Sequence, residues 1–372
     1  MNEISQHSPI RPATVTVADV AREAGVSKAT AARVLGGYGT VSDRIRDAVK
    51  AAARALDYRP NELARSMTTG RSGTIGVVVG DIENSFFSLA VRGISDVARQ
   101  AGFTVILANS GEDIAAEKAA VRTLLAKRVD GLIVSPAREN DVGHLNDVMR
   151  SGRPIVLLDR GSDVLDVDSV IADDKHAAEV VTRKLVSLGH REIAYLTAYD
   201  STPDGFRTPS DIHLGSVRRR IEGVLQVGRE AGIEGMEAWV RTGASTAETT
   251  SDIVRALMTA DPRPTAIIAS DSIIGLEVFR TCRELGISLP ADLSLVTFHN
   301  ADWTSVTTPP VSVVEQPVYE LGTTAAGLLM DRLRGNDEKA RIRVLPTRFI
   351  DRESMGEKRL NQPRLASATE KQ

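Results

Sequence analysis

The sequence predicts an α/β protein in which an all-α helix-turn-helix head precedes a two-lobed core of doubly wound parallel sheets. Three observations support this prediction: apolar residues at helical spacing between residues 17 and 56, a short linker at 69–73, and then apolar runs that alternate with amphipathic helices. Strands that lack polar alternation and alternate with helices indicate parallel sheets covered on both faces. A chain of 372 residues is too long for one core and predicts two or three domains.

Residues 17–35, VADVAREAGVSKATAARVL, are typical of two short helices joined by a tight turn. Thr16 stands where an N-cap belongs, and Asp19 follows three residues later as in a capping box. Gly25 supplies the left-handed position that ends the first helix, and Ser27 caps the second. This spacing is that of a helix-turn-helix, whose second helix enters the major groove of DNA.

The exposed face of the second helix offers Lys28, Ala29 and Arg33, and small basic surfaces of this kind suit close approach to bases and phosphates. An isolated two-helix pattern is equally compatible with any surface helical hairpin. A third amphipathic helix, between Val41 and Leu56, favours the DNA-binding interpretation.

The charge of the chain is unevenly distributed. Residues 11–72 contain 11 Lys and Arg against 6 Asp and Glu, whereas the remainder contains 35 against 43. A basic head on an acidic body suits a phosphate-contacting module attached to a small-molecule sensor.

The segment DYRPNELARSMTTGRSG makes the resemblance specific. Tyr58, Pro60, Asn61 and Ala64 match a "Y-x-P-N" element and hinge, and the chain resembles the lactose-repressor/galactose-repressor (LacI/GalR) family from about Thr16 to Gly356. The resemblance implies a periplasmic-binding-protein-like core and a cytoplasmic homodimer. It also implies a transcriptional repressor that binds a palindromic double-stranded DNA operator and is controlled by a small-molecule effector, a sugar or sugar derivative.

In this arrangement Lys28 and Ala29 meet base edges, the lysine donating to guanine and the alanine contacting a thymine methyl group, while Arg33 meets a base or a phosphate. Further phosphate-contact candidates, each equally interpretable as a cap or a solvated side chain, are Thr16, Ser27, Thr30 and Arg44. The family has Val-Ser where this chain has Ala31-Ala32, so the phosphate interaction of that serine hydroxyl is expected to be absent.

The hinge, Asn61 to Thr68, is expected to be a helix that bends DNA. Met67 occupies the position of the family's leucine, an apolar wedge between base pairs in the minor groove, and the small Ala64 approaches that groove closely. Eight residues form a marginal helix alone, so we expect it to fold only when it is paired on DNA. Movement of the lobes then controls operator binding.

The predicted domain boundaries follow these patterns. They are a disordered tail at 1–14, the head at 15–60, the hinge and linker at 61–72, the core at 73–356 and a disordered tail at 357–372. Within the core, lobe 1 spans about 73–171 and 306–334, and lobe 2 spans about 172–299 and 341–356.

An effector cleft is expected between the lobes at the carboxyl ends of the strands. Most candidates follow predicted strands: GDIENSFFS is similar to the family's "N-P-F-F" loop, and the R-x-x-G in RRRIEG implies that Arg220 clamps ligand oxygens. The candidate effector-binding residues are Asn84, Phe86, Phe87, Ser135, Asp159, Arg220, Asp271, His299, Trp303 and Gln316.

The sequence TFHN departs from the family's "G-F-D-D", whose first aspartate accepts hydrogen bonds from a sugar. His299 can donate or accept a hydrogen bond or carry a positive charge there. Two interpretations follow: either the ligand differs, for example by bearing a carboxylate or phosphate, or the site has lost the usual preference for a sugar. Trp303 is equally suited to stacking on a sugar and to plain packing.

Enzymatic alternatives find little support. The six histidines lack metal-like spacing, neither a G-x-S-x-G elbow nor a Walker-type loop occurs, and no metal or cofactor is expected. One cysteine, Cys282, suits a reducing cytoplasm, and neither a signal peptide nor a membrane anchor is expected. Two hypotheses remain: an effector-controlled DNA-binding regulator, and a sugar-binding sensor module whose head has lost DNA affinity through Ala31-Ala32 and Met67.

Overall fold

The computed structural model describes residues 15–58, 70–162, 164–199 and 206–358 of the chain. The chain divides into two compact units, Met1–Ser72 and Gly73–Gln372. The predicted terminal tails, apart from residues 357 and 358, and the predicted hinge residues Asn61, Ala64 and Met67 lie outside the described residues.

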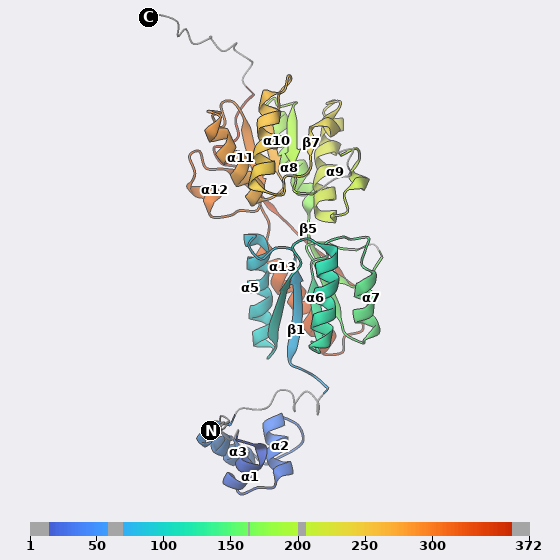
Figure 1. Ribbon diagram of the computed structural model, residues 1–372, viewed down its shortest axis with the longest axis vertical. Helices are drawn as coiled ribbons and strands as arrows, with labels where there is room; N and C mark the ends of the chain where they lie inside the picture. Colours follow the sequence, from blue (N-terminus) through green and yellow to red (C-terminus); the bar gives the residue numbers. More distant parts are fainter. Residues whose placement is uncertain (1–14, 59–69, 163, 200–205, 359–372) are drawn as a thin grey trace, which may run out of the picture. The chain divides into compact units, whose positions relative to one another are not determined.

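The described residues of the first unit form three helices, α1 (Val17–Glu23), α2 (Lys28–Gly36) and α3 (Asp43–Ala55) (Figure 1). The predicted capping box is confirmed, because Thr16 and Asp19 exchange backbone and side-chain hydrogen bonds. Ser27 caps α2 by accepting from the Thr30 N–H at 3.1 Å, and Gly25 has a φ of 64°. The helices enclose a small core of Val20, Ala21, Ala31, Val49 and Ala52.

In the second unit, lobe 1 is a parallel six-stranded sheet in the order β11-β5-β4-β3-β1-β2. Its strands are β1 (Thr74–Val79), β2 (Thr104–Asn109), β3 (Gly131–Val134), β4 (Ile155–Leu158), β5 (Asp168–Ala172) and β11 (Ile342–Leu345). Helices α5 (Ser85–Gln100) and α13 (Val318–Leu333) pack on one face, and α6 (Ile114–Ala126) and α7 (Gly143–Arg150) on the other (Figure 1).

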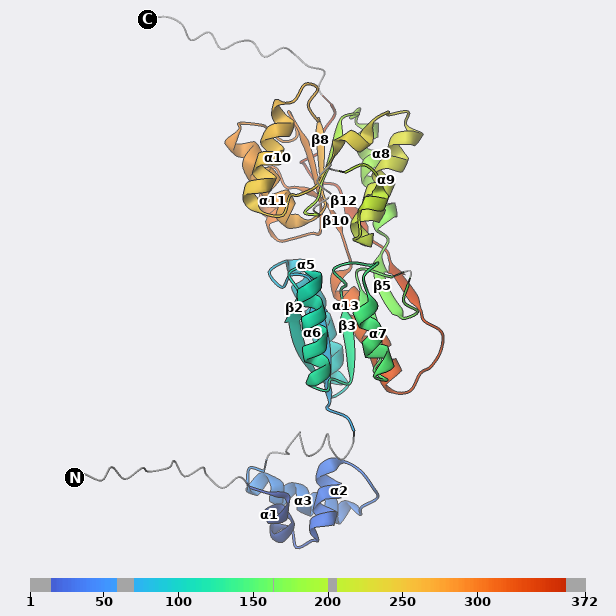
Figure 2. The same ribbon diagram turned by 45° about the vertical axis from the view of Figure 1, so that its right-hand side comes forward.

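Lobe 2 has a second six-stranded sheet in the order β12-β10-β9-β8-β6-β7, in which only β12 is antiparallel to its neighbour. Its strands are β6 (Ile193–Leu196), β7 (Val240–Arg241), β8 (Ala266–Ala269), β9 (Ser294–Phe298), β10 (Ser312–Glu315) and β12 (Arg348–Ile350). Its helices are α8 (Asp174–Ser187), α9 (Gly215–Glu230), α10 (Ala247–Thr259), α11 (Ser272–Glu284) and the short α12 (Trp303–Val306). Figure 2 shows α10 and α11 on one side of this sheet and α8 and α9 on the other.

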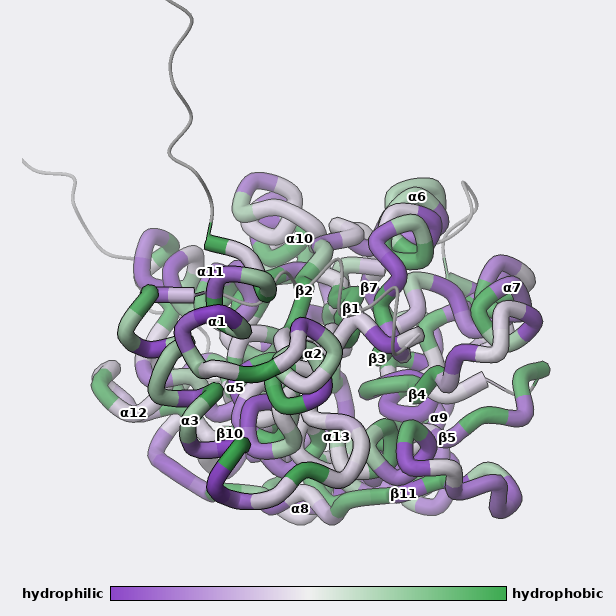
Figure 3. The backbone as a smooth tube through the Cα atoms, turned by 90° about the horizontal axis from the view of Figure 1, so that it is seen from below, coloured by the Kyte–Doolittle hydropathy of each residue, from purple (hydrophilic) through white to green (hydrophobic). Residues whose placement is uncertain are grey.

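The inner strands of both sheets are buried, as the apolar runs predicted, whereas the edge strands β11 and β12 are exposed or only partly buried. Strands β3, β4, β6 and β8 are buried along their whole length, whereas β2, at a sheet edge, is half exposed. Figure 3 shows the strands as mostly apolar, and polar and apolar stretches alternating along helix α7. The apolar stripes of the helices therefore cover the strands, which is what a doubly wound sheet requires.

Two predicted crossings between the lobes are wrong. Strand β10 belongs to the sheet of lobe 2, although the boundary at residue 306 had assigned it to lobe 1. Strand β11 pairs with β5 in lobe 1, although residues 341–356 were expected in lobe 2. The chain therefore crosses near residues 316–317 and 346–347. Short apolar runs look alike in sequence, and only their hydrogen-bond partners assign them to a sheet.

A close approach of α5 and α13 gives a stability prediction. A Cβ on Gly322 would lie 2.1 Å from the carbonyl oxygen of Ala90, a backbone atom that cannot turn aside. Gly322→Ala is therefore expected to destabilise the protein by about 1–3 kcal/mol, measured by chemical denaturation. Gly327→Ala, on the same helix but facing open space, should instead stabilise it by up to about 1 kcal/mol. Equal shifts in the two variants would contradict this packing.

Candidate functional site

Helix α2 and the start of α3 present exposed basic side chains. Lys28, Ala29, Arg33 and Arg44 are exposed, and neither Lys28 nor Arg33 makes an ion pair with any described residue. Arg22 and Arg46, by contrast, pair with acids on their own helices. The cations of α2 are therefore available to an outside anion.

The hydroxyl groups predicted to contact phosphate have local partners. Thr16 donates to Asp19 at 2.7 Å, and the Ser27 and Thr30 hydroxyls lie 2.8 Å apart. Thr16 and Ser27 therefore act as helix caps, and their contacts with phosphate remain predictions. Ala31 is fully buried, so this part of the Ala31-Ala32 departure is a core position.

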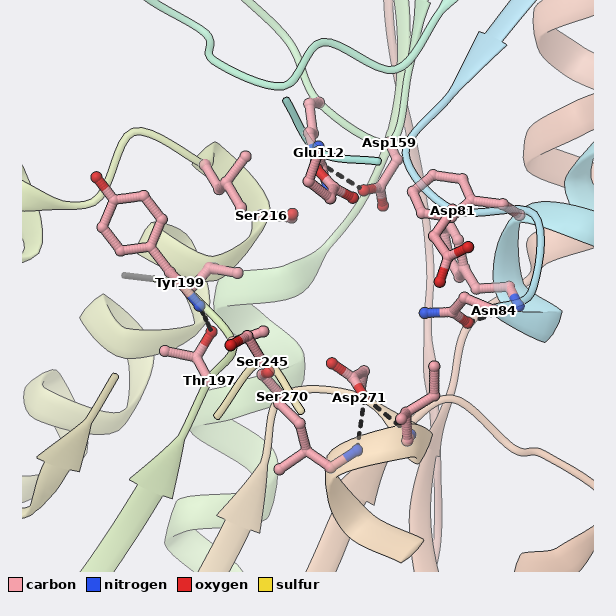
Figure 4. Close-up of a pocket in the computed structure, with 18 of the residues that line it drawn as sticks. Asp81, Asn84, Glu112, Asp159, Thr197, Tyr199, Ser216, Ser245, Ser270 and Asp271 are labelled. Carbon is pink, nitrogen blue, oxygen red and sulfur yellow. Dashed lines mark hydrogen bonds and ion pairs between the residues drawn. The ribbon is translucent and has the colours of Figure 1, made fainter. Parts of the chain in front are cut away.

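A cavity of about 610 Å³ lies between the two lobes of the second unit. Strand ends and helix N-termini from both lobes line it, and Figure 4 shows Glu112 and Asp159 on one side and Thr197, Ser270 and Asp271 on the other. The predicted residues that the fold brings together here are Asn84, Phe86, Phe87, Asp159, Arg220, Asp271, His299 and Gln316.

Two predicted site residues do not line this cavity. Ser135 is fully buried beyond the end of β3, and its hydroxyl has no hydrogen-bond partner among the described residues. Trp303 begins α12 and packs against the lobe 2 core, with its ring 6.3 Å from that of Phe279. Ser135 was predicted to lie in the cleft because it follows a strand, but its side chain is buried inside the lobe instead.

Several lining residues were missed by the sequence analysis. They include Glu112, Arg160, Thr197, Tyr199, Ser216 and Ser245. Glu112, Arg160 and Tyr199 follow predicted strands, so the signal that found Asp159 would have found these as well, whereas Thr197 lies within a predicted strand. Ser216 lies in the first turn of α9 and Ser245 shortly before α10, so neither gave such a signal.

The lobe 1 wall is built around two carboxylates and one arginine. Arg160 binds Glu112 through two hydrogen bonds of 2.5 and 2.8 Å and also donates to the carbonyl of Pro136. Asp159 has a φ of 66°, and its Oδ2 lies 3.5 Å from the Arg160 Nε. Its Oδ1 accepts no hydrogen bond from the described residues. Burial raises the pKa of Asp159, although nearby arginines oppose this.

The lobe 2 wall contains Arg220, which is buried and already paired. Its Nε lies 2.7 Å from Asp174 Oδ1, its Nη1 donates to the Ser270 carbonyl at 2.7 Å, and its guanidinium stacks 4.3 Å from the Phe298 ring centre. Burial raises the pKa of Asp174 to about 6, with Arg220 opposing the shift. Asp271 accepts from the N–H groups of Ile273 and Ile274 at the start of α11.

His299 bridges the lobes. Its Nε2 lies 2.9 Å from the Ser85 hydroxyl, and its ring meets Phe86 edge to face at 6.0 Å between centroids. Burial and the charge of Arg220 lower the pKa of His299 to about 4. The imidazole is therefore neutral at physiological pH and supplies no positive charge to a ligand, which removes the basis for an anionic group at this position.

A second set of interlobe contacts lies near the start of α9. Arg218 donates to Glu139 at 3.0 Å, the Glu139 N–H donates to the carbonyl of His213 at 3.2 Å, and Asn140 lies 3.2 Å from the His213 ring nitrogen. Together with the Ser85–His299 contact, these bonds hold the two lobes together around the cavity.

The neutrality of His299 gives a pH prediction. The unfolded ring has a pKa near 6.5, whereas the folded one has a pKa of about 4, so the folded state binds fewer protons between these values. Stability contributed by the neutral ring is present above pH 6.5 and is lost as the pH falls toward 4, by about 3 kcal/mol. Chemical denaturation of wild type and His299→Asn across this pH range measures the decrease in unfolding free energy that comes from His299. Asn is the suitable replacement because it tolerates a positive φ and does not titrate.

The comparison of the two proteins is needed because Asp174 acts in the opposite direction. Its raised pKa means that the folded state gains protons relative to the unfolded state between about pH 6 and 3.8, so stability rises as the pH falls there. Asp174 is present in both proteins, so its contribution to the pH dependence cancels in the difference. Parallel pH profiles would show that His299 does not titrate as described.

The fold and the site define a class of protein: a helix-turn-helix unit with exposed cations, joined to a two-lobed sensor with a polar cavity between its lobes. Family models agree with both parts. Residues 16–61 match the bacterial regulatory proteins of the lacI family, and residues 182–355 match a periplasmic binding protein-like domain.

Relatives match almost the full length of the chain. Catabolite control protein A of Staphylococcus xylosus is 30% identical over 337 residues, covering 90% of this chain and 98% of the relative. The transcriptional repressor PurR of Proteus mirabilis is 29% identical, covering 92% and 97%. The lac repressor dimer bound to operator and an anti-inducer superimposes with a TM-score of 0.78 at 28% identity, covering 92% and 99%. This chain belongs to the lacI family of bacterial regulatory proteins.

The chain is a DNA-binding transcriptional regulator of this family. Among the described helices, none has the length and apolar character needed to cross a membrane. The described residues contain no group of three or more His, Cys, Asp or Glu side chains arranged to hold a metal ion.

Proposed function

We propose that this protein is a cytoplasmic, non-enzymatic repressor that binds a palindromic operator as a homodimer and is controlled by a small hydroxylated effector between its lobes. The observation that carries the proposal is the polar cavity closed by contacts from both lobes. A ligand that contacts both walls changes the relative position of the two lobes. This movement of the lobes then controls operator affinity.

The lining suits a polyhydroxyl ligand. Hydroxyl groups of Thr197, Ser216 and Ser245 and the carboxylates of Asp159 and Asp271 provide donors and acceptors, and the rings of Phe86 and Phe87 provide an apolar surface. Two solved relatives support this choice: the regulator CelR in complex with cellobiose, 27% identical, and a LacI-family regulator from Enterococcus faecium with bound ribose, 29% identical.

For the head, we assign base contacts to Lys28, Ala29 and Arg33 and phosphate contacts to Thr16, Ser27, Thr30 and Arg44. The exposure of Lys28 and Arg33 supports the assignment. We also keep the minor-groove roles of Asn61, Ala64 and Met67 as proposals. The relative seen as a dimer on its operator supports the homodimer and the operator for this chain.

The proposal is tested by selecting fragments from a random palindromic DNA library with the full chain and measuring their mobility shifts at several salt concentrations. A specific shift that weakens steeply with salt is expected, because basic contacts with phosphates release counterions. Addition of an effector found by thermal-shift screening should change the apparent Kd of the selected fragment. A chain that binds such a ligand yet shifts no fragment specifically would be a sensor module without operator function.

A further inference from the structure

The ionisable side chains around the interlobe cavity are unequally matched. Among the described lining residues the acids are Asp81, Glu112, Asp159 and Asp271, and the bases are Arg138, Arg160 and Arg220. Arg160 is neutralised by Glu112 and Arg220 by Asp174, a carboxylate just behind the lining. Both buried arginines therefore already have a carboxylate partner, and a ligand phosphate or carboxylate would gain little binding free energy from them.

Asp159 is the carboxylate left without a full partner. Its side chain is only 6% exposed, and its Oδ2 shares an arginine that already binds Glu112 in a bidentate manner. Its Oδ1 is buried and accepts no hydrogen bond from the residues that the structure describes. Leaving a buried charged acceptor unmatched costs free energy, which a ligand group placed beside it can recover.

The two arginines nearest Asp159 in the lining each pair more closely with another carboxylate, Arg160 with Glu112 and Arg220 with Asp174. His299, the ionisable group that bridges the cavity, is neutral near pH 7. On the opposite wall, Asp271 is a half-buried carboxylate, whose two backbone hydrogen bonds both go to Oδ1. Figure 4 shows Asp159 and Asp271 on opposite sides of the same space.

Resting on the proposed function, we infer that the effector carries an ammonium group that pairs with Asp159, on a hydroxylated ring such as an amino sugar. An ammonium supplies a full positive charge and three donors, whereas a sugar hydroxyl supplies one donor and no charge. Charge-assisted hydrogen bonds are about twice as strong as neutral ones, and most so where water is excluded. The hydroxyl groups of Thr197, Ser216 and Ser245 remain for the ring.

The test compares matched sugars on the full chain by thermal shift and titration calorimetry. Glucosamine, galactosamine and mannosamine are each measured beside the parent sugar, the N-acetyl derivative and the 6-phosphate of the same ring. At least one amine should bind about tenfold or more tightly than its uncharged counterparts, the equivalent of one charge-assisted contact. A panel in which no amine raises the melting temperature, or in which a parent sugar or phosphate binds as tightly as its amine, overturns the inference.

A variant identifies the carboxylate responsible. Asp159→Asn keeps the side-chain size and tolerates the positive φ, but it removes the charge. The amine is expected to lose its advantage over the parent sugar, with its affinity falling by about 30-fold or more. Glu234→Gln, which removes an exposed carboxylate outside the cavity lining, should leave the amine-to-parent ratio unchanged. An unchanged ratio in Asp159→Asn overturns the assignment.

Folding and operator binding are followed in the same preparations. Without ligand, Asp159→Asn should unfold at the same or a higher temperature than wild type, since an unmatched buried charge is removed. Operator shifts measured without ligand distinguish a failure of the ammonium inference from a failure of the proposed function. Intact operator binding with no preference for amines refutes only the ammonium, whereas loss of specific operator binding by wild type refutes the proposed function.

Discussion

Arg220→Met is expected to destabilise the second unit by about 3–5 kcal/mol and to abolish the effector response. The variant leaves the buried Asp174 without its nearest cation, because Arg220 provides that carboxylate's closest contacts, at 2.7 Å, and Arg219 lies 4.0 Å away. It also removes the donor to the Ser270 carbonyl and the stacking on Phe298. Chemical denaturation measures the first effect, and operator shifts with and without effector measure the second.

A double variant separates the loss of stability from the loss of response. In Arg220→Met/Asp174→Asn the uncompensated charge is absent, so most of the lost stability should return, while the effector should still fail to change operator affinity. Arg220→Lys provides a control that keeps the charge but not the planar fork. Normal induction in the double variant would show that Arg220 has no role in ligand sensing.

Lys28→Ala/Arg33→Ala is expected to weaken operator binding on the order of 100-fold or more, because each side chain is assigned an interaction worth about 1–3 kcal/mol. Lys28→Ala alone should also relax the preference at one position of each half-site. If Arg33 binds a phosphate, removing its charge should reduce the slope of log K against log salt by about one for each phosphate that it neutralises. Mobility shifts on the selected operator and on point-substituted fragments give all three quantities.

Lys50→Ala is the matched control, because it removes one exposed charge from α3 of the same unit. It should leave the sequence preference intact and change affinity by a small, salt-dependent amount. If the double variant and this control lose similar affinity, α2 is not the helix that enters the major groove.

Local patterns were sufficient for most of the secondary structure. Thr16 and Ser27 predicted two helix starts because a capping hydroxyl needs only its own neighbours. The buried strands followed from apolar runs in the same way. The lobe assignments of Ser312–Glu315 and Ile342–Leu345 were wrong, since a short apolar run does not record which strand it pairs with.

The candidate site was predicted in part for a related reason. Asn84, Asp159 and Asp271 follow strands, and parallel strands bring their carboxyl ends to one edge, so these residues were expected to meet. The pairing of Arg220 with Asp174 was not predicted. Their 46-residue separation in sequence is closed only by the packing of α8 against α9.

By itself, the sequence determined the family, the two-part architecture and the basic face of the second helix, because these depend on local spacing and on motifs. Only the tertiary structure decided which charges are already neutralised. It showed that Arg220 and Arg160 are paired, that His299 is held neutral, and that Asp159 keeps an oxygen without a partner among the described residues. Burial and distance control electrostatic interactions, and both arise only when distant segments of the chain pack together.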